Sequence, residues 1–344
     1  MNIFDNKRIL ITGGTGSIGS TLVKEILKNY KPKQIRIFSR DDSKQFQLMQ
    51  DIGENAPVNF LIGDVRDKDR LMRAMENIDI VFHAAAMKHV FLCERNPFEA
   101  YQTNVQGTQN VIDCALSAGV DRVVNISTDK AVNPSSVLGT TKLMAERLML
   151  SSSFYKGDKK TKFCSVRFGN VLWSRGSVFP LFVKQIRSGK PLTVTDLEMM
   201  RFFMSMKEAA NLVLEAAQMT KESEIFVLKM PAVKMSDAVE ALQEIMIEEG
   251  IVKKPSPVQI VGAKEGERTH EKLLTMEESK NALETDKLYI ILPNFAVIPI
   301  KKIPNISYPN TKRAKSSEYS TDKSREISKK DLKKLLSEGG FYKQ

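Results

Sequence analysis

Short apolar runs alternate with longer amphipathic segments through the first half of the chain. Several runs are almost continuously apolar, as parallel strands are when both of their faces are covered. The predicted strands are Arg8 to Thr12, Gln34 to Phe38, Val58 to Ile62, Ile78 to Phe82, Arg122 to Ser127 and Phe163 to Phe168. The predicted helices between them span about residues 17–29, 43–52, 68–76, 97–118 and 138–154. This alternation predicts an α/β fold with a doubly wound parallel sheet.

After Phe168 the pattern becomes less regular. Helices are expected near residues 178–188, 207–219 and 236–249, with short strands near 192–195, 225–228 and 258–261. We interpret this half as a smaller, discontinuous α/β substrate lobe and not as an independent second domain. The expected division is a nucleotide-binding domain over 1–170, a mainly substrate-binding lobe over 171–310 with some segments returning to the first domain, and a basic C-terminal tail over 311–344 that contains one helix near 329–336.

Composition narrows the class of protein. The chain has 344 residues, of which 42% are hydrophobic, enough for one large α/β unit with a lobe. No window has the roughly 20 apolar residues of a membrane helix, and the N-terminus does not read as a signal peptide, so a cytoplasmic protein without a membrane span is expected. The three cysteines and three histidines show no ligand spacing, so neither a disulfide nor a metal site is predicted.

The net charge of +11 is concentrated near the C-terminus. Residues 311–344 hold ten Lys/Arg and five Asp/Glu, so this segment supplies +5 of the total. No aromatic-interleaved basic motif accompanies it, which favours a solvated face over a nucleic-acid surface. The alternative, nucleic-acid binding, predicts a steep salt dependence that disappears when the segment is removed. A basic surface also suits a polyanionic small substrate.

A glycine-rich turn stands between the first predicted strand and the first predicted helix. Glycines recur at three-residue intervals in Thr-Gly-Gly-Thr-Gly-Ser-Ile-Gly, residues 12–19, a spacing typical of dinucleotide-binding turns. The free N–H groups of the helix N-terminus would hold the pyrophosphate. The pattern therefore predicts a Rossmann-like sheet. The expected loop contacts are Gly13, Thr15, Gly16, Ser17, Ile18 and Gly19.

The end of the second strand bears on which nicotinamide cofactor binds. Where an NAD-binding fold has an acidic residue for the ribose 2′-hydroxyl, this chain has Ser39 and Arg40, with Lys44 one turn later. Cations at this place favour the 2′-phosphate of NADP. NAD is the less favoured alternative, because Asp41 and Asp42 follow directly and would serve it if they turned toward the ribose.

The ends of the third and fourth strands continue the same crevice. Asp64 is placed to accept a hydrogen bond from an adenine amine, and a helix N-cap is an equal interpretation of this residue. The alanines after His83 would let a flat ring lie close to the backbone. The cofactor contacts expected here are Asp64, Val65, Ala84, Ala85 and Ala86.

An acidic and a basic residue are adjacent just after the fifth strand. Asp129 and Lys130 stand where ligands bind in a doubly wound sheet, so we interpret them as catalytic; a surface ion pair is the alternative. As a base, Lys130 must lose a proton, which needs its pKa to fall about three units from about 10.4, or some 4 kcal/mol. Burial and a nearby cation, such as Lys142 or an oxidised nicotinamide, would act in that direction.

Several motifs resemble a known superfamily and a narrower family within it. The glycine turn, Asn104 and the Leu138-x-x-x-Lys142 spacing are similar to the extended short-chain dehydrogenase/reductases, which normally carry Tyr-x-x-x-Lys at the latter place. More narrowly, the chain resembles the bacterial UDP-N-acetylglucosamine 4,6-dehydratases of flagellin-glycan and capsule polysaccharide biosynthesis. The blocks that carry this resemblance are residues 38–41, 84–88, 127–131, 167–171, 174–178, 201–202, 266–267 and 319–321.

The resemblance implies a reaction and a set of site residues. NADP⁺ would take hydride from sugar C4, water would leave across C5 and C6, and hydride would return to C6, with inversion at C5 and a tightly held, recycled cofactor. Lys130 would remove the C5 proton and Asp129 would assist departure of the C6 hydroxyl, each worth about 10²- to 10⁴-fold. A homo-oligomer is also implied. The further implied cofactor ligands are Asn104, Ser127, Lys142 and Val171, and the implied ligands of the nucleotide sugar are Lys88, Asn170, Ser174, Arg175, Ser177, Val178, Thr195, Arg201, Lys264 and Glu267.

Leu138 departs from the superfamily pattern. An alkyl side chain cannot accept the C4 hydroxyl proton, which leaves Thr128, Asp129, Lys130 or water to take it. The capsule branch of the family also carries an apolar residue here, so leucine is compatible with an active enzyme. The alternative functions are a nucleotide-sugar 4-epimerase, which needs no base for C5, and a non-catalytic NADP-binding regulatory protein.

Overall fold

The computed structural model describes residues 2–262, 266–293 and 306–343. Its centre is a ten-stranded sheet in which β3, β2, β1, β4, β5, β6 and β10 are neighbours in that order and all parallel. An antiparallel edge of β15, β14 and β16 completes it. The order 3-2-1-4-5-6 is that of dinucleotide-binding sheets, which confirms the predicted fold class. The strands are β1 Arg8–Thr12, β2 Gln34–Ser39, β3 Val58–Ile62, β4 Ile80–His83, β5 Arg122–Ile126, β6 Lys162–Arg167, β10 Ser223–Leu228, β14 Ala282–Glu284, β15 Leu288–Ile291 and β16 Lys312–Arg313.

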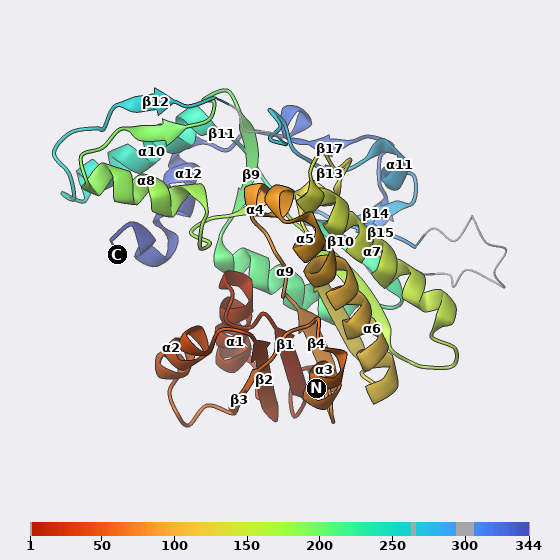
Figure 1. Cartoon of the computed structure of the whole chain (residues 1–344). Helices are drawn as coiled ribbons and strands as arrows, with labels where there is room; N and C mark the ends of the chain where they lie inside the picture. Colours follow the sequence, from red (N-terminus) through yellow and green to blue (C-terminus); the bar gives the residue numbers. More distant parts are fainter. Residues whose placement is uncertain (1, 263–265, 294–305, 344) are drawn as a thin grey trace.

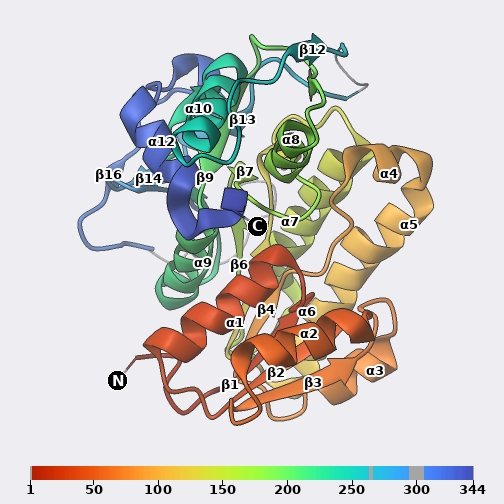
Figure 2. The ribbon, with the colours of Figure 1, turned by 90° about the vertical axis from the view of Figure 1, so that its left-hand side faces the viewer.

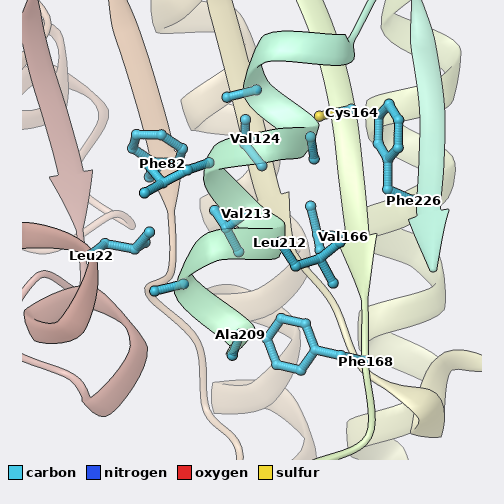
Figure 3. Close-up of a cluster of buried hydrophobic side chains, with 14 of the residues drawn as sticks. Leu22, Phe82, Val124, Cys164, Val166, Phe168, Ala209, Leu212, Val213 and Phe226 are labelled. Carbon is cyan, nitrogen blue, oxygen red and sulfur yellow. The ribbon is translucent and has the colours of Figure 1, made fainter. Parts of the chain in front are cut away.

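Helices cover both faces of the sheet (Figure 1). One face packs against α1 (Ser17–Asn29) and α9 (Met206–Met219), the other against α3 (Lys68–Ala74), α6 (Gly107–Ala118) and α7 (Val137–Tyr155). The α2 helix (Asp42–Ile52) connects β2 to β3. Figure 3 shows α9 presenting small and branched side chains, Ala209, Leu212 and Val213, toward Val124 and Val166 of the sheet. Each such fully buried aliphatic side chain stabilises the fold by about 1.5–3 kcal/mol, so the cofactor-binding edge rests on a rigid base.

The predicted helix over 97–118 is divided into three pieces. A π-helical turn (Gln102–Gln106) separates α5 (Pro97–Tyr101) from α6, and the short α4 (Val90–Arg95) precedes α5. Such turns are frequent at functional sites. Here the turn carries Asn104, whose Oδ1 accepts from the Met87 backbone N–H at 2.8 Å and whose Nδ2 donates to the Met87 carbonyl at 3.1 Å. The turn therefore anchors the chain that leaves β4.

The small lobe is assembled from separate segments of the second half (Figure 2). Its aromatic core includes Phe179, Phe182 and Phe203, while α9 and β10 return from this half to the central sheet. Its elements are β7 (Asn170–Val171), α8 (Val178–Arg187), β8 (Leu192–Val194), β9 (Met200–Met204), β11 (Ala232–Lys234), α10 (Met235–Glu248) and β12 (Val258–Ile260). Near the junction of lobe and sheet lie β13 (Lys272–Leu274), α11 (Met276–Ser279) and β17 (Tyr319–Ser320).

The charge-rich C-terminal segment begins with β16 in the central sheet and ends in this lobe. Its helix α12 (Lys329–Ser337) buries Leu332, Leu335 and Leu336 in the lobe's core. Its lysines pair with glutamates of α10: Lys329 and Lys333 both lie within 2.7 Å of Glu244 oxygens. Exposed pairs of this kind contribute about 0–1 kcal/mol each, so the leucines hold the helix in place.

Candidate active site

A cavity of about 760 Å³ lies between the carboxyl end of β5 and the small lobe. Its wall includes the turn after β5, the start of α8, the strands β8 and β9, and residues 266–272. The predicted site residues that line it are Asp129, Lys130, Asn170, Val171, Ser174, Ser177, Val178, Thr195, Arg201 and Glu267. Lys264 lies outside the described residues.

Asp129 and Lys130 occupy a single 3₁₀ turn, Asp129–Ala131, directly after β5. Lys130 Nζ lies 3.2 Å from both carboxylate oxygens of Asp129, and Thr128 Oγ1 donates to Asp129 Oδ1 at 2.7 Å. The turn is held tightly, because a Cβ at Gly139 of α7 would lie 2.3 Å from the Lys130 carbonyl oxygen. The Asp129 side chain is buried, whereas that of Lys130 is 33% exposed toward the cavity. The pair is thus an interior ion pair facing a cavity.

A third charged group, Glu271, completes the cluster and was missed in the sequence. Its Oε1 lies 3.6 Å from Lys130 Nζ and 3.3 Å from Arg201 Nε. Asn170 Nδ2 donates to both of its oxygens, at 3.1 and 2.9 Å. Its backbone is held by Thr321, whose N–H donates to the Glu271 carbonyl at 2.9 Å. The one available signal was its place just before a short apolar strand, a few residues after the recognised Gly266-Glu267 motif.

The three groups influence each other's protonation. Burial alone would raise the pKa of Asp129, but the Lys130 ammonium and hydrogen bonds from Thr128 and Glu271 outweigh it and hold that pKa below its ordinary value. Burial, followed by the charge of Asp129, raises the pKa of Glu271 to about 7. Near neutral pH the cluster therefore combines an ionised Asp129 with a Glu271 that is able to hold a proton.

The expectation that Lys130 has a lowered pKa is wrong for the protein without ligands. Burial acts to lower the pKa of Lys130, but the carboxylates of Asp129 and Glu271 outweigh it, so the pKa lies above its ordinary value. Burial instead lowers the pKa of Lys142, to about 8. Lys142 is directed elsewhere, since its Nζ donates to the carbonyl of Ile126 at the end of β5.

The glycine turn fits a dinucleotide pyrophosphate. Gly13 has φ +64°, and a Cβ there would meet the backbone of Ala84 and Ala85 at 2.7–2.8 Å. A Cβ at Gly19 would lie 2.4 Å from the Gly13 carbonyl oxygen. No side chain caps the first turn of α1, so its N–H groups are available to an anion. The close backbone approach and the open helix N-terminus are the two features that a pyrophosphate requires.

The residues expected near the adenosine ribose lie around the end of β2. Ser39 Oγ accepts from Thr15 Oγ1 at 3.2 Å, and the Arg40 side chain is 61% exposed, 3.7 Å from Asp64. Asp41 caps α2 by accepting from the Lys44 N–H, and its carboxylate also pairs with Lys44 Nζ. Asp41, one of the two carboxylates considered for NAD, is therefore engaged in capping.

Two further residues that were predicted to contact the cofactor, Asp64 and Val65, follow the end of β3. Asp64 accepts from the backbone N–H and the guanidinium of Arg66, and these bonds keep its pKa low although burial opposes them. It is not the cap of α3, which is Asp67, so the N-cap interpretation is wrong. The Val65 side chain is buried in the core beside Gly107, which leaves only its backbone for a ligand.

Ser127 belongs to a buried polar network beneath the site. Its hydroxyl donates to Glu146 Oε1 at 2.5 Å, and Glu146 in turn pairs with Arg167 at 2.6 Å. Arg167 also pairs with Glu278 of α11 at 3.0 Å. This network joins β5, α7, β6 and α11 behind the Asp129 turn.

The loop over 174–177 connects the cavity to the glycine turn. The Arg175 backbone N–H donates to Ser17 Oγ at 3.0 Å, and its guanidinium donates to the Thr15 carbonyl. Lys88 Nζ donates to the Arg175 carbonyl. Arg175 and Lys88, predicted as ligands of the nucleotide sugar, are thus placed at the cofactor turn and do not line the cavity.

Comparison with known proteins agrees with this geometry. The family model described as "Polysaccharide biosynthesis protein" matches residues 9–293, most of the chain. The chain belongs to this family.

Relatives in the family carry different names. A UDP-N-acetylglucosamine 4,6-dehydratase (inverting) of Campylobacter jejuni is 42% identical over 86% of this chain and 86% of its own. A UDP-glucose 4-epimerase of Rickettsia bellii is 41% identical over 84% of each chain. A protein of Methanocaldococcus jannaschii named as an uncharacterized membrane protein is 48% identical over 85% of this chain and 87% of its own. None of the helices in the described part of our chain is long and apolar enough to cross a membrane.

Solved structures show the same fold. The X-ray structure of Pen from Bacillus thuringiensis has a TM-score of 0.89 and 44% identity, covering 98% of this chain and 99% of its own. A dTDP-glucose 4,6-dehydratase of Streptomyces venezuelae with bound NAD has a TM-score of 0.66 at 22% identity, covering 76% of this chain and 86% of its own. The predicted membership in a polysaccharide-biosynthesis family that includes UDP-N-acetylglucosamine 4,6-dehydratases, and the prediction of an enzyme, are confirmed.

Leu138 distinguishes this member from the superfamily pattern. It is 4% exposed and packs in a small apolar cluster with Cys93 and Ala100. Among the described residues that line the cavity there is no tyrosine. The groups able to exchange a proton where β5 meets the cavity include Asp129, Lys130 and Glu271.

Proposed function

We propose that the protein is an NADP-dependent 4,6-dehydratase of UDP-N-acetylglucosamine that inverts C5 and makes a UDP-4-keto-6-deoxy sugar for a surface polysaccharide or glycan. The observation that carries this proposal is the cluster of Asp129, Lys130 and Glu271 at the cavity, which the loop over 174–177 links to the glycine turn. Elimination of water needs a base at C5 and an acid at the C6 oxygen, whereas epimerisation at C4 needs neither.

Each residue of the turn after β5 has a place in this chemistry. NADP⁺, when bound, supplies the hydride acceptor for C4 and the hydride donor for C6. Thr128 is hydrogen-bonded to Asp129, so it is placed to pass the C4 hydroxyl proton to that carboxylate. Lys130 then takes the C5 proton, and Asp129 assists the loss of the C6 hydroxyl. Substrate and oxidised nicotinamide must lower the pKa of Lys130, and protonation of Glu271 removes one of the charges that raise it.

The start of α8 is suited to the diphosphate of the substrate. Ser174 and Ser177 line the cavity at the N-terminus of this helix. The Ser177 hydroxyl is buried and has no hydrogen-bond partner within the described part of the chain. An anionic oxygen would satisfy this hydroxyl and the helix N–H groups together.

The test is incubation of the NADP-loaded protein with UDP-N-acetylglucosamine in D₂O, followed by NMR. A 4-keto-6-deoxy sugar with deuterium at C5 and altered C5 configuration is the expected product. The relatives named as epimerases make a nucleotide-sugar 4-epimerase the second candidate. A C4 epimer with an unchanged C6 hydroxymethyl group and no deuterium would contradict the dehydratase and support that candidate.

Arg40→Ala is expected to weaken NADP binding by about 10- to 100-fold while changing NAD binding little. A charged hydrogen bond to the 2′-phosphate is worth about 1.5–3 kcal/mol, and Arg40 is the exposed cation at the end of β2. Calorimetric titration with both cofactors measures the effect, and Arg73→Ala, an exposed arginine on α3, is the matched control. Equal losses for NADP and NAD would contradict the preference for NADP.

We also propose a cytoplasmic homo-oligomer. Exposed aromatic side chains on α4 and α5, Phe91, Phe98 and Tyr101, suit an interface between copies. Sedimentation of the purified protein tests this.

A further inference from the structure

We propose that Glu271 is the acid that protonates the departing C6 hydroxyl, and that Asp129, ionised before the reaction begins, is the partner that returns a proton to it. This inference rests on the proposed dehydratase function. It differs from the simplest reading of the Asp129–Lys130 pair, in which Asp129 supplies that proton itself.

Geometry indicates one shared proton between the two carboxyl groups. Asp129 and Glu271 are both buried, and both have an oxygen within 3.6 Å of Lys130 Nζ, so a proton on one of them relieves the repulsion between two neighbouring carboxylates. The Lys130 ammonium lies 3.2 Å from both oxygens of Asp129 but 3.6 Å from the nearer oxygen of Glu271. Asp129 is therefore the better place for the negative charge, and Glu271 the better place for the proton.

The surroundings of Glu271 allow both of its protonation states. In the described part of the chain, the charged groups that face its carboxyl are Asp129, Lys130 and Arg201. Neutral groups that contact it include the amide of Asn170 and the N–H of Phe202. Burial and Asp129 raise its pKa to about 7, while Lys130 and Arg201 oppose this shift. A carboxyl group with such a pKa donates a proton at neutral pH and is stabilised as an anion afterwards.

With these assignments, every proton transferred in the reaction has a donor and an acceptor. Oxidation at C4 releases the hydroxyl proton, which passes through Thr128 to Asp129. The C5–H bond then breaks and its proton goes to Lys130, which must first have released its own proton to solvent as substrate and oxidised nicotinamide lowered its pKa, while the electron pair forms the C5–C6 double bond. The C6–O bond breaks, and its oxygen takes the Glu271 proton and leaves as water. The proton on Asp129 restores Glu271, and Lys130 loses its proton as C5 regains one during hydride return to C6.

Glu271→Gln separates elimination from oxidation. With UDP-N-acetylglucosamine the variant is expected to accumulate reduced nicotinamide, while 6-deoxy product forms about 10²- to 10⁴-fold more slowly. With the 6-deoxy-6-fluoro analogue of this substrate the loss should largely disappear, because fluoride leaves without a proton. Lys130→Ala is the comparison variant, since removal of the C5 proton is needed for both leaving groups.

The outcomes distinguish the two proposals. If the wild-type protein gives no 4-keto product, the dehydratase function is wrong. If the wild-type protein dehydrates but Glu271→Gln loses the same factor on both leaving groups, or loses nothing, Glu271 is not the acid.

A measurement on the wild-type protein tests the same point without a variant. The rate with the hydroxyl substrate should fall as pH rises through about 7, because Glu271 then loses its proton. With the fluoro substrate, the rate should not fall as pH rises through this range. Infrared spectra of the protein alone should show a carboxylic acid C=O band that titrates near the same pH, disappears in Glu271→Gln and persists in the exposed control Glu277→Gln. A pH limb shared by both substrates, or an unchanged infrared band, would overturn the assignment.

Discussion

Replacing Lys130 with alanine is expected to slow dehydration by about 10²- to 10⁴-fold while leaving C4 oxidation measurable. Lys130 is the amine at the end of β5 that faces the cavity, and the other lysine of this region, Lys142, is turned to the Ile126 carbonyl. Without an amine beside C5, the 4-keto intermediate should form and persist. Single-turnover experiments that follow nicotinamide absorbance and the 6-deoxy product separately measure the two steps.

The Lys130 variant also separates the candidate functions. A 4-epimerase needs no base at C5, so its activity should survive the substitution. Lys280→Ala, which removes an exposed lysine on the surface near α11, is the matched control and should leave both steps unchanged. Full retention of dehydration in Lys130→Ala would show that the C5 base lies elsewhere.

Arg167→Met is expected to lower the free energy of unfolding by about 3–5 kcal/mol. Arg167 is 1% exposed and pairs with Glu146 at 2.6 Å and with Glu278 at 3.0 Å, so its loss leaves two carboxyl groups without their cation. Urea unfolding measures the change. The exposed pair of Lys280 with Glu277 gives the control, because Lys280→Met should change stability by about 0.5 kcal/mol or less.

The loss of stability caused by Arg167→Met should depend on pH in one direction. In the wild-type protein burial would raise the pKa of Glu278, but Arg167 outweighs this effect and keeps that pKa low. Ionised Glu278 therefore stabilises the fold at pH values above its pKa in the unfolded chain, and this stabilisation is lost as pH falls. Without Arg167, the hydrogen bonds from Thr275 are left to oppose burial, and we expect burial, the larger effect, to raise the pKa of Glu278 above the unfolded value. Stability then falls as pH rises, so the variant's deficit should be smaller at acidic than at alkaline pH.

A further variant tests the cause. Adding Glu146→Gln and Glu278→Gln to Arg167→Met should recover much of the lost stability, since no buried charge is then unpaired. If the triple variant is no more stable than the single one, packing and not charge accounts for the loss.

Local patterns in the sequence were enough to predict the parallel strands of the sheet and the glycine turn. The alternation of apolar runs with helical segments was enough for the order of elements, and the spacing of Gly13, Gly16 and Gly19 was enough for the turn, because both depend on residues that are neighbours in the chain. The π-helical turn at Asn104 was not visible, since its pattern is that of an ordinary helix. The C-terminal segment was described by its charge, whereas its leucines on α12 pack into the small lobe.

The candidate active site, too, was predicted from the sequence only in part. The sequence alone placed Asp129 and Lys130 together after a buried strand, since adjacency and strand position are local properties. Only the tertiary structure decided that Glu271 lies against them, that the pKa of Lys130 is raised, and that Arg175 contacts the cofactor turn. Protonation depends on burial and on charges from distant segments, and these distances exist only after the chain has folded.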